Sequence, residues 1–252
     1  MSAMRRLLPF SAIALLVAIW QLAVTLSHAL LIPGPWEVVK GIWELAERGL
    51  LVKYVVASLY RVTWGYVLAV VVAIPLGLML GWFTRGQKAL NPVLQILRPI
   101  SPLAWIPISI LWFGVGDMAA IFLIFLASFL PMAVTAMNSV RNIATVHLNA
   151  GRNFGLSHGQ LVRKVIYPAV MPQLIVGLRI TLGVAWLVVV AAEMIAVNSG
   201  LGFLIMDSRN AGNRYDLVIA GMVLIGSIGL LLDVAMRKLE KLKSLRWGYR
   251  SV

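Results

Sequence analysis

The chain has 252 residues, of which 61% are hydrophobic and 12% charged, with a mean hydropathy of +0.91. A soluble domain is nearer half apolar and about one quarter charged, so this composition indicates an all-α polytopic membrane protein. The absence of cysteine excludes disulfides and thiolate chemistry, and three scattered histidines indicate no metal site. The net charge of +13 fits the Lys/Arg bias of cytoplasmic loops better than a nucleic-acid surface.

Long apolar runs, each near the length that spans a bilayer as a helix, predict six membrane helices. The expected ranges are 9–32, 55–82, 89–113, 118–139, 169–197 and 216–236. The first has the basic start of a signal peptide, but its apolar run exceeds the usual 7–15 residues, so a retained helix is favoured over a cleaved one. In the second, Gly65, Gly77 and Gly81 suit close helix approach. Prolines in the third predict a bend or break.

The segment 33–53, between the first two predicted spans, is too polar to cross the membrane. Trp36, Val39 and Trp43 recur near helical spacing, while Glu37 belongs to the other face. This pattern predicts a helix lying at the outer interface, with its tryptophans at headgroup depth in contact with membrane lipid.

The distribution of positive charge predicts the orientation. If the N-terminus is inside, cytoplasmic segments hold 14 of the 22 Lys and Arg residues and the opposite side holds 5. Lys and Arg concentrate on the cytoplasmic side of membrane proteins. We therefore expect both termini in the cytoplasm.

A polar segment between the fourth and fifth spans has the signals of two short helices. Asn142 or Thr145 is expected to cap the first helix, and Gly155 to end it in a left-handed conformation. Ser157 and Gln160 form an S-x-x-Q capping box for the second. An ordinary basic loop is the alternative, but capped loops of about 30 residues are uncommon without a function. Docking of a partner is the favoured interpretation.

The stretch NAGRNFGLSHGQLVRKVIYP, residues 149–168, resembles the EAA loop of the membrane permeases of ABC importers. That pattern is Glu-Ala-Ala, three residues, Gly, nine residues, then Ile-x-Leu-Pro. Four positions keep its spacing: Ala150, Gly155, Val165 and Pro168. Three positions depart from it: Asn149 replaces the Glu, Gly151 the second Ala and Tyr167 the Leu. The resemblance implies that coupling to an ATPase involves Asn149, Ala150, Gly151, Gly155, Leu156, Ser157, Leu161, Val165 and Pro168.

Further stretches are similar to the permeases of nitrate, sulfonate, taurine and bicarbonate importers. The most specific are RPISPLAWIPISILWFGVGD and AAEMIAVNSGLG. The resemblance implies a six-helix permease bundle: one domain over 1–252, with a core at about 55–240 and a cytoplasmic coupling loop at 145–168. It also implies a bacterial inner-membrane protein that imports a small anionic solute by alternating access.

The same resemblance implies the partners: a cytoplasmic ABC ATPase, a second permease expected to be an identical copy, and a periplasmic solute-binding protein. The chain contains no Gly-Lys dipeptide and hence no P-loop. It is therefore expected to be a transport subunit without an enzyme site or cofactor of its own, with ATP and Mg held by the ATPase. The alternative is a secondary transporter driven by an ion gradient, although no internal repeat supports it.

Charged side chains within spans are candidates for the transport pathway or its gate, because each is costly when it faces lipid. The candidates, with neighbouring polar and aromatic residues, are Arg61, Arg98, Ser101, Trp105, Trp112, Asn138, Arg179 and Glu193. Arg179 and Glu193 are about 21 Å apart along one helix and cannot pair with each other. Glu193 could meet an arginine of another span or of the second subunit. The alternative is that these charges form buried ion pairs that hold the bundle together.

Overall fold

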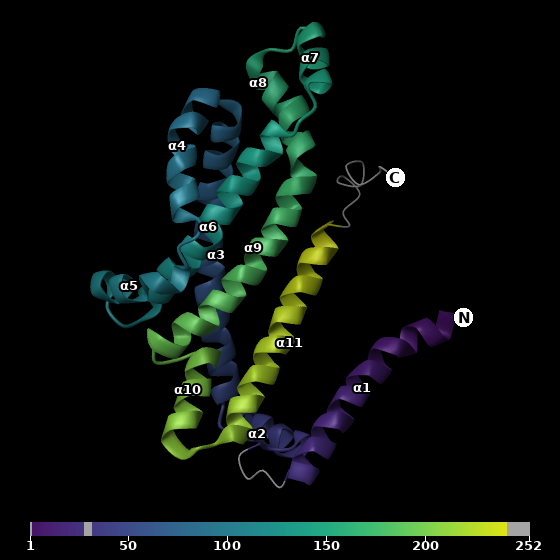
Figure 1. The fold of residues 1–252 in the computed structure, drawn as a ribbon, viewed down its shortest axis with the longest axis vertical. Helices are drawn as coiled ribbons and strands as arrows, with labels where there is room; N and C mark the ends of the chain where they lie inside the picture. The colour runs from purple at the N-terminus through teal and green to yellow at the C-terminus, as the bar shows by residue number, and fades with distance from the viewer. Residues whose placement is uncertain (1, 28–31, 241–252) are drawn as a thin grey trace.

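The computed structural model describes residues 2–27 and 32–240, and every regular element in them is helical (Figure 1). In chain order the elements are α1 (Ser2–Ser27), α2 (Pro35–Glu47), α3 (Leu50–Trp82), α4 (Thr84–Leu97), the 3₁₀ helix η1 (Pro102–Trp105), α5 (Ile106–Phe113), α6 (Asp117–Arg141), α7 (Thr145–Asn153), α8 (His158–Leu161), the π-helix η2 (Val162–Ile166), α9 (Tyr167–Ile195), α10 (Leu201–Gly212) and α11 (Tyr215–Glu240). The all-α prediction is confirmed.

Within the described residues, four helices are long and apolar enough to cross a membrane. They are α3, α6, the continuous run from α8 through α9, and α11, which match four of the predicted spans. The bent helix pair Arg85–Leu97 and Pro102–Phe113 would raise the number to five if it forms one span. In α1 the apolar stretch Ser11–Leu26 is shorter than these four, and residues 28–31 of the predicted first span lie outside the described residues. By length and composition, the described residues thus contain four or five spans, and the predicted number of six is not confirmed.

The predicted third span is broken, as its prolines indicated. Arg85–Leu97 and Pro102–Phe113 are inclined to one another by 84°. Proline has no N–H to donate and disfavours helical geometry in the residue before it, so Pro99 and Pro102 end one helix and start another. Ser101 Oγ accepts a hydrogen bond from the Leu103 N–H at 3.3 Å and so caps η1.

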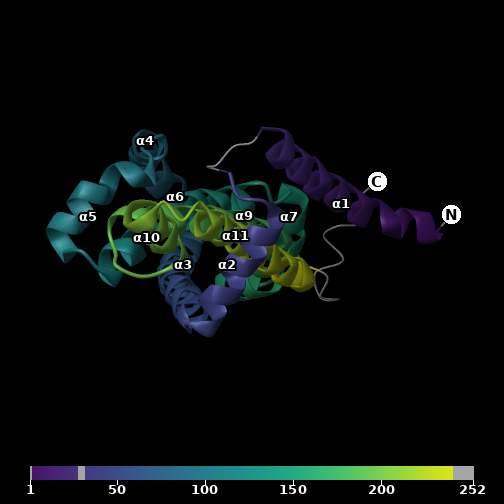
Figure 2. The same cartoon turned by 90° about the horizontal axis from the view of Figure 1, so that it is seen from below.

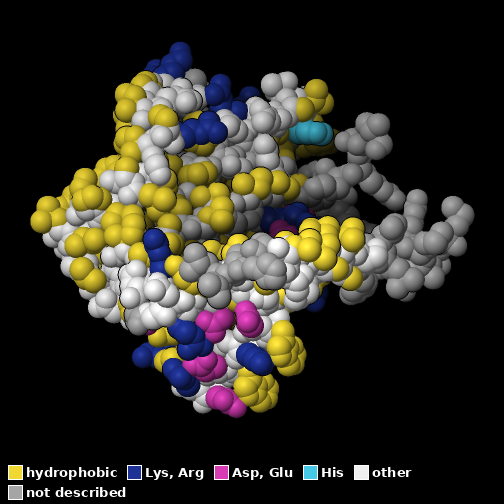
Figure 3. All heavy atoms as spheres, turned by 60° about the horizontal axis from the view of Figure 1, so that its bottom comes forward, with side chains coloured by type: hydrophobic (Ala, Val, Ile, Leu, Met, Phe, Trp, Pro, Cys, Tyr) yellow, Lys and Arg dark blue, Asp and Glu magenta, His cyan; other side chains and the backbone are white. Residues whose placement is uncertain are grey.

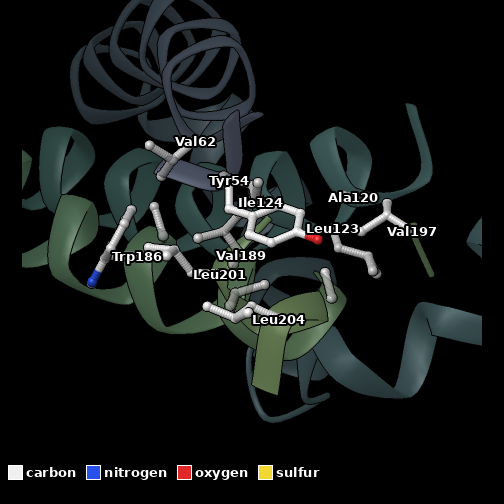
Figure 4. Packing of buried hydrophobic residues seen from close by; sticks show 14 of the residues in the cluster. Tyr54, Val62, Ala120, Leu123, Ile124, Trp186, Val189, Val197, Leu201 and Leu204 are labelled. Carbon is white, nitrogen blue, oxygen red and sulfur yellow. The ribbon is translucent and has the colours of Figure 1, made fainter. Parts of the chain in front are cut away.

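The core of the bundle is the close contact of α3, α6 and α9. Gly65, Gly77 and Gly81 bring the backbones of α3 and α6 together, as expected. A Cβ atom on Gly77 would lie only 2.4 Å from the carbonyl oxygen of Ala133. Further along, apolar side chains of these helices and α10 fill the interior, with the Tyr54 ring among them (Figure 4).

At the end of the bundle opposite α7 and α8, α2 is the helix predicted for segment 33–53. Val38, Gly41 and Leu45 are buried, whereas Trp36 and Trp43 are 67% and 68% exposed. The buried face packs against α11, at the end of the molecule opposite α7 and α8 (Figures 1 and 2). Two exposed tryptophans on a helix with one buried face suit the membrane interface.

Acidification is expected to release α2 from the turn between α10 and α11. Arg214 Nη2 lies 2.6 Å from Glu44 Oε2, and this hydrogen bond lowers the pKa of Glu44 below its ordinary value of 4.5. A lowered pKa in the folded state means that the tether is complete above the ordinary pKa and is lost as pH falls through the lowered one. Hydrogen-exchange protection factors of α2 amides should therefore fall as pH drops below the ordinary Glu pKa of 4.5. In Arg214→Gln they should be low throughout; a pH-independent wild type would contradict the tether.

The sequence did not predict α10, which lies at the same end as α2, beside α9 and α11 (Figure 1). The apolar helix α1 extends away from the bundle next to α2 (Figures 1 and 2), and most of its described side chains are exposed. In a membrane protein, such apolar surface faces lipid or another subunit.

Candidate functional site

The segment 145–168 folds as a helical hairpin beyond the ends of α6 and α9 (Figure 1). Gly155 ends α7 with φ of 71°, a left-handed conformation. The Gln160 N–H donates to Ser157 Oγ at 3.4 Å, and the Ser157 N–H donates to Gln160 Oε1 at 3.0 Å. The predicted turn and capping box are therefore confirmed. The predicted caps of α7 were wrong: Ala144 precedes its first turn, and Asn142 instead caps the end of α6.

The hairpin of residues 145–168, here named the coupling hairpin after the family loop that it resembles, is closely packed on its inside. Gly151 is buried, and a Cβ atom there would lie 2.6 Å from Leu161 Cδ1 and 3.2 Å from Val165 Cγ2. Glycine in place of the family's alanine thus permits the close contact of α7 with α8 and η2. Leu161 is 2% exposed, so its side chain holds the hairpin together and is not available to a partner.

The coupling hairpin also presents exposed apolar side chains that the sequence patterns did not indicate. Phe154 is 84% exposed and Val146 72% exposed, and Asn149 and Ala150 on the same helix are also exposed. An aromatic residue directly before the left-handed glycine, in an otherwise polar segment, is the signal that was available. Large exposed apolar side chains on an element that lies beyond the ends of the long apolar helices suit a protein interface.

A π-helix joins the coupling hairpin to α9. Its residues, Val162–Ile166, directly precede α9, in whose first turn Pro168 lies. Pro168 has no N–H, so it cannot donate the α-helical hydrogen bond to the carbonyl oxygen of residue 164. The π-helix, with its wider turn, is found where this bond is missing. Pro168 also lines a 910 Å³ cavity between the hairpin and the span ends, together with Ala150, Leu156 and Phe154.

Two of the charges predicted within spans meet in a buried network at the N-terminus of α10. Arg61 Nη1 lies 2.7 Å from Glu193 Oε1, and both side chains are almost fully buried. Arg61 also pairs with Asp117 at 2.7 Å and donates to the backbone oxygen of Ser199 at 2.6 Å. Glu193 is thus neutralised by an arginine of another span, one of the two possibilities anticipated.

The carboxylate of Glu193 also caps α10. Its Oε2 accepts hydrogen bonds from Ser58 Oγ at 2.8 Å and from the Gly202 N–H at 3.0 Å. Ser58 Oγ in turn accepts the Leu201 N–H at 3.0 Å. A carboxylate at a helix N-terminus satisfies otherwise unpaired N–H groups. One network therefore joins α3, α6, α9 and α10.

Arg179 forms a second ion pair between helices. Its Nε lies 2.6 Å from Asp233 Oδ1 on α11, and its Nη1 lies 3.4 Å from Glu240 Oε1. This pair joins α9 to α11 at the end nearer the coupling hairpin. Arg61, Arg179 and Glu193 thus have the inter-helix partners that the ion-pair alternative requires.

The remaining pathway candidates lie around the broken span. Arg98 follows α4 and is exposed, and it forms no ion pair within residues 2–27 and 32–240. Ser101 and Trp105 lie in the bend itself, whereas Trp112 is exposed on α5. Asn138 is exposed on α6, towards the coupling hairpin. The structure does not bring these residues into the Arg61 or Arg179 ion pairs.

Comparison with known proteins assigns the family. Residues 73–244 match the family described as binding-protein-dependent transport system inner membrane component. The chain belongs to this family. It is a multi-pass membrane protein and the permease subunit of an ABC importer. ATP is bound by a separate ATPase subunit, and the permease itself is not an ATPase and binds no cofactor.

Full-length relatives support this assignment. The chain is 35% identical to the taurine transport system permease protein TauC of Escherichia coli, over 93% of this chain and 87% of that protein. It is 36% identical to the nitrate import permease protein NrtB of Leptolyngbya laminosa, over 91% of this chain and 85% of that one. An inward-facing structure of the MetNI methionine ABC transporter contains a chain of similar fold, with TM-score 0.62 and 21% identity. The alignment covers 82% of this permease and 96% of that chain.

Proposed function

We propose that this permease and a second copy of it form the membrane pathway for a small anion that a periplasmic binding protein delivers. Nitrate, bicarbonate, a sulfonate or taurine would suit the family branch, since relatives are a taurine and a nitrate permease. The cycle is alternating access, with the ATPase driving the spans between outward and inward states. Membership in a binding-protein-dependent family disfavours an ion-driven secondary transporter.

Charge supports an orientation with the coupling hairpin and both termini in the cytoplasm. The hairpin, residues 145–168, carries Arg152, Arg163 and Lys164 without any Asp or Glu. The opposite end carries acidic and basic side chains around α2 (Figure 3). This asymmetry follows the positive-inside rule. Four basic residues that the orientation places in the cytoplasm lie outside the described residues: Lys241, Lys243, Arg246 and Arg250.

The coupling hairpin is proposed to dock on the ATPase through Phe154 and Val146. This is the observation on which the mechanism rests: two large apolar side chains are exposed on a segment whose inner face is packed through Gly151 and Leu161. A rigid hairpin transmits displacement, and its continuity through η2 with α9 carries that displacement into the membrane. Asn149, exposed where the family has Glu, would contribute a neutral contact.

The broken span is proposed to contribute the anion pathway. Arg98 is exposed without a carboxylate partner among the described residues, and helix starts made by proline breaks add partial positive charge. Ser101 and Asn138 would add hydrogen-bond donors. Arg61 and Glu193 are assigned a structural role in the same scheme, because each is already neutralised by the other.

The Phe154→Asp variant is expected to lose its ATPase partner. Truncating or charging a central apolar contact commonly costs about 2 kcal/mol or more, or roughly 30-fold in affinity. The measurement is the amount of ATPase that co-purifies with the tagged permease from detergent, together with binding-protein-stimulated ATP hydrolysis. Phe154→Leu, which keeps an apolar side chain, is the matched control and should retain the ATPase. Wild-type recovery of ATPase with Phe154→Asp would contradict docking at this face.

A further inference from the structure

An apolar cavity opens where the hairpin end of α3 meets α6 and η2. Its volume is 310 Å³. The lining residues are aliphatic or aromatic, among them Met79, Trp82, Phe83, Val162 and Tyr167. Several of these side chains are about half exposed, so the cavity is reached from outside the bundle. Such a slot, at the end of two membrane spans, suits a hydrocarbon chain.

A polar cavity of 350 Å³ adjoins the apolar one. The two share Trp82 and Val140 as lining residues, so they are neighbouring compartments of one depression. Arg141 at the end of α6 and Arg152 at the end of α7 line the polar compartment. Gln87 also lines it.

The arginines of the polar compartment have no acidic partner. The sequence has no Asp or Glu between Glu47 and Asp117, or between Asp117 and Glu193. All residues that line the compartment come from these two stretches. Neither Arg141 nor Arg152 forms an ion pair within the described part of the chain, and Lys and Arg side chains mark the upper edge in Figure 3. The compartment therefore has an unmatched positive charge of two guanidinium groups.

We propose that the two compartments form one site for an anionic phospholipid of the cytoplasmic leaflet. The phosphate would lie between Arg141 and Arg152, whose planar donors suit phosphate oxygens. An acyl chain would fill the apolar compartment, with Trp82 and Tyr167 at headgroup depth. The proposal rests on the orientation given above, which places the hairpin end in the cytoplasm.

The charge and shape of the depression favour a lipid over other occupants. The chain's own segment 241–252 is basic, with Lys241, Lys243, Arg246 and Arg250, and has the wrong sign for this site. A small transported anion has no hydrocarbon chain that would fill the apolar compartment. A bound phospholipid would touch α3, α6 and α7 together and so stabilise the coupling hairpin against the ends of the spans.

The proposal is tested by native mass spectrometry of the full chain with dioleoyl phosphatidylglycerol or dioleoyl phosphatidylcholine. Phosphatidylglycerol should be retained in preference. A basic side chain beside an anionic lipid contributes about fivefold in affinity, so the double variant Arg141→Gln, Arg152→Gln should bind about 30-fold more weakly. Replacing both arginines with lysine should preserve most of the preference. The matched control, Arg85→Gln with Lys88→Gln, removes equal charge at the same end but outside both compartments and should change little.

Several results would overturn the lipid site. Equal retention of the two lipids, or equal weakening by the control pair, would show a diffuse charge effect. Two results would show that no acyl chain lies in the apolar compartment. One is displacement of phosphatidylglycerol by an equal concentration of glycerol phosphate, and the other is unchanged binding of phosphatidylglycerol by the Val162→Trp variant. Loss of the lipid when the ATPase binds would assign the depression to the ATPase interface. Co-purification of the ATPase is a separate measurement. If no ATPase co-purifies with the wild-type permease, the proposed function is contradicted, whereas the lipid measurement remains valid.

Discussion

The Arg61→Ala variant is expected to lose about 3–5 kcal/mol of stability, because it leaves a buried carboxylate without its counter-charge. Glu193 is fully buried, and Arg61 Nη1, 2.7 Å away, is its only cationic partner in the described residues. The same variant removes the hydrogen bond to Ser199 and the ion pair with Asp117. The loop before α10 would then be attached to α3 through Ser58 and Leu201 but no longer through Ser199. The measurement is the midpoint of thermal unfolding in detergent.

Two further variants separate this ion pair from a generic charge effect. Arg48→Ala removes an exposed pair with Glu44, and such pairs contribute about 0–1 kcal/mol, so its melting temperature should change little. The double variant Arg61→Met, Glu193→Gln removes both charges but keeps an acceptor oxygen for Ser58 and the Gly202 N–H, and it should recover part of the loss because no buried charge is left unpaired. If Arg61→Ala melts like Arg48→Ala, the network does not hold the helices together.

The Gly77→Val variant is expected to separate α3 from α6. A Cβ atom at this position would lie 2.4 Å from the carbonyl oxygen of Ala133 and 2.6 Å from the Cβ of Ala136. The nearest obstacle is backbone and cannot rotate away, so the helices must move apart along their longest contact. Overpacking of this kind costs about 1–3 kcal/mol, and we expect the upper part of that range or more. Loss of folded, monodisperse protein in detergent is the measurement.

Gly226 offers a control for the glycine prediction. It lies in α11, and a Cβ atom there would meet nothing within 4 Å. Gly226→Val makes the same chemical change in another membrane helix and should leave the yield and melting temperature close to wild type. Equal losses in the two variants would mean that helix propensity, rather than the close approach of α3 and α6, explains the effect at Gly77.

Much of the molecule could be predicted from residues close together in the sequence. Apolar runs placed α3, α6, α9 and α11, because a membrane helix satisfies its backbone hydrogen bonds within itself. The prolines around Pro99 predicted the break for the same reason. Gly155 and the Ser157–Gln160 box predicted the turn of the coupling hairpin, since caps act over three or four residues. The spacing of 149–168 then indicated the transporter family.

The predictions that failed or stopped short depended on contacts between distant segments. The cap of α7 depended on where α6 ended, so Asn142 was assigned to the wrong helix. The α10 helix has no long apolar run; its N-terminus is satisfied by Ser58 and Glu193, distant in sequence. The exposure of Phe154 follows from the turn at Gly155 and from the packing of Gly151. Neither can be recognised by counting apolar residues along the sequence.

The sequence by itself determined the class of protein, most of its spans and the family, because these follow from composition, local periodicity and motif spacing. Only the tertiary structure decided what the charges within the membrane do. Arg61 and Glu193 are 132 residues apart in the chain but 2.7 Å apart in space. A charge in a bilayer needs a partner, yet the sequence does not say which helix supplies it. The packing of α3, α6 and α9 does, and it makes this pair a structural joint between helices.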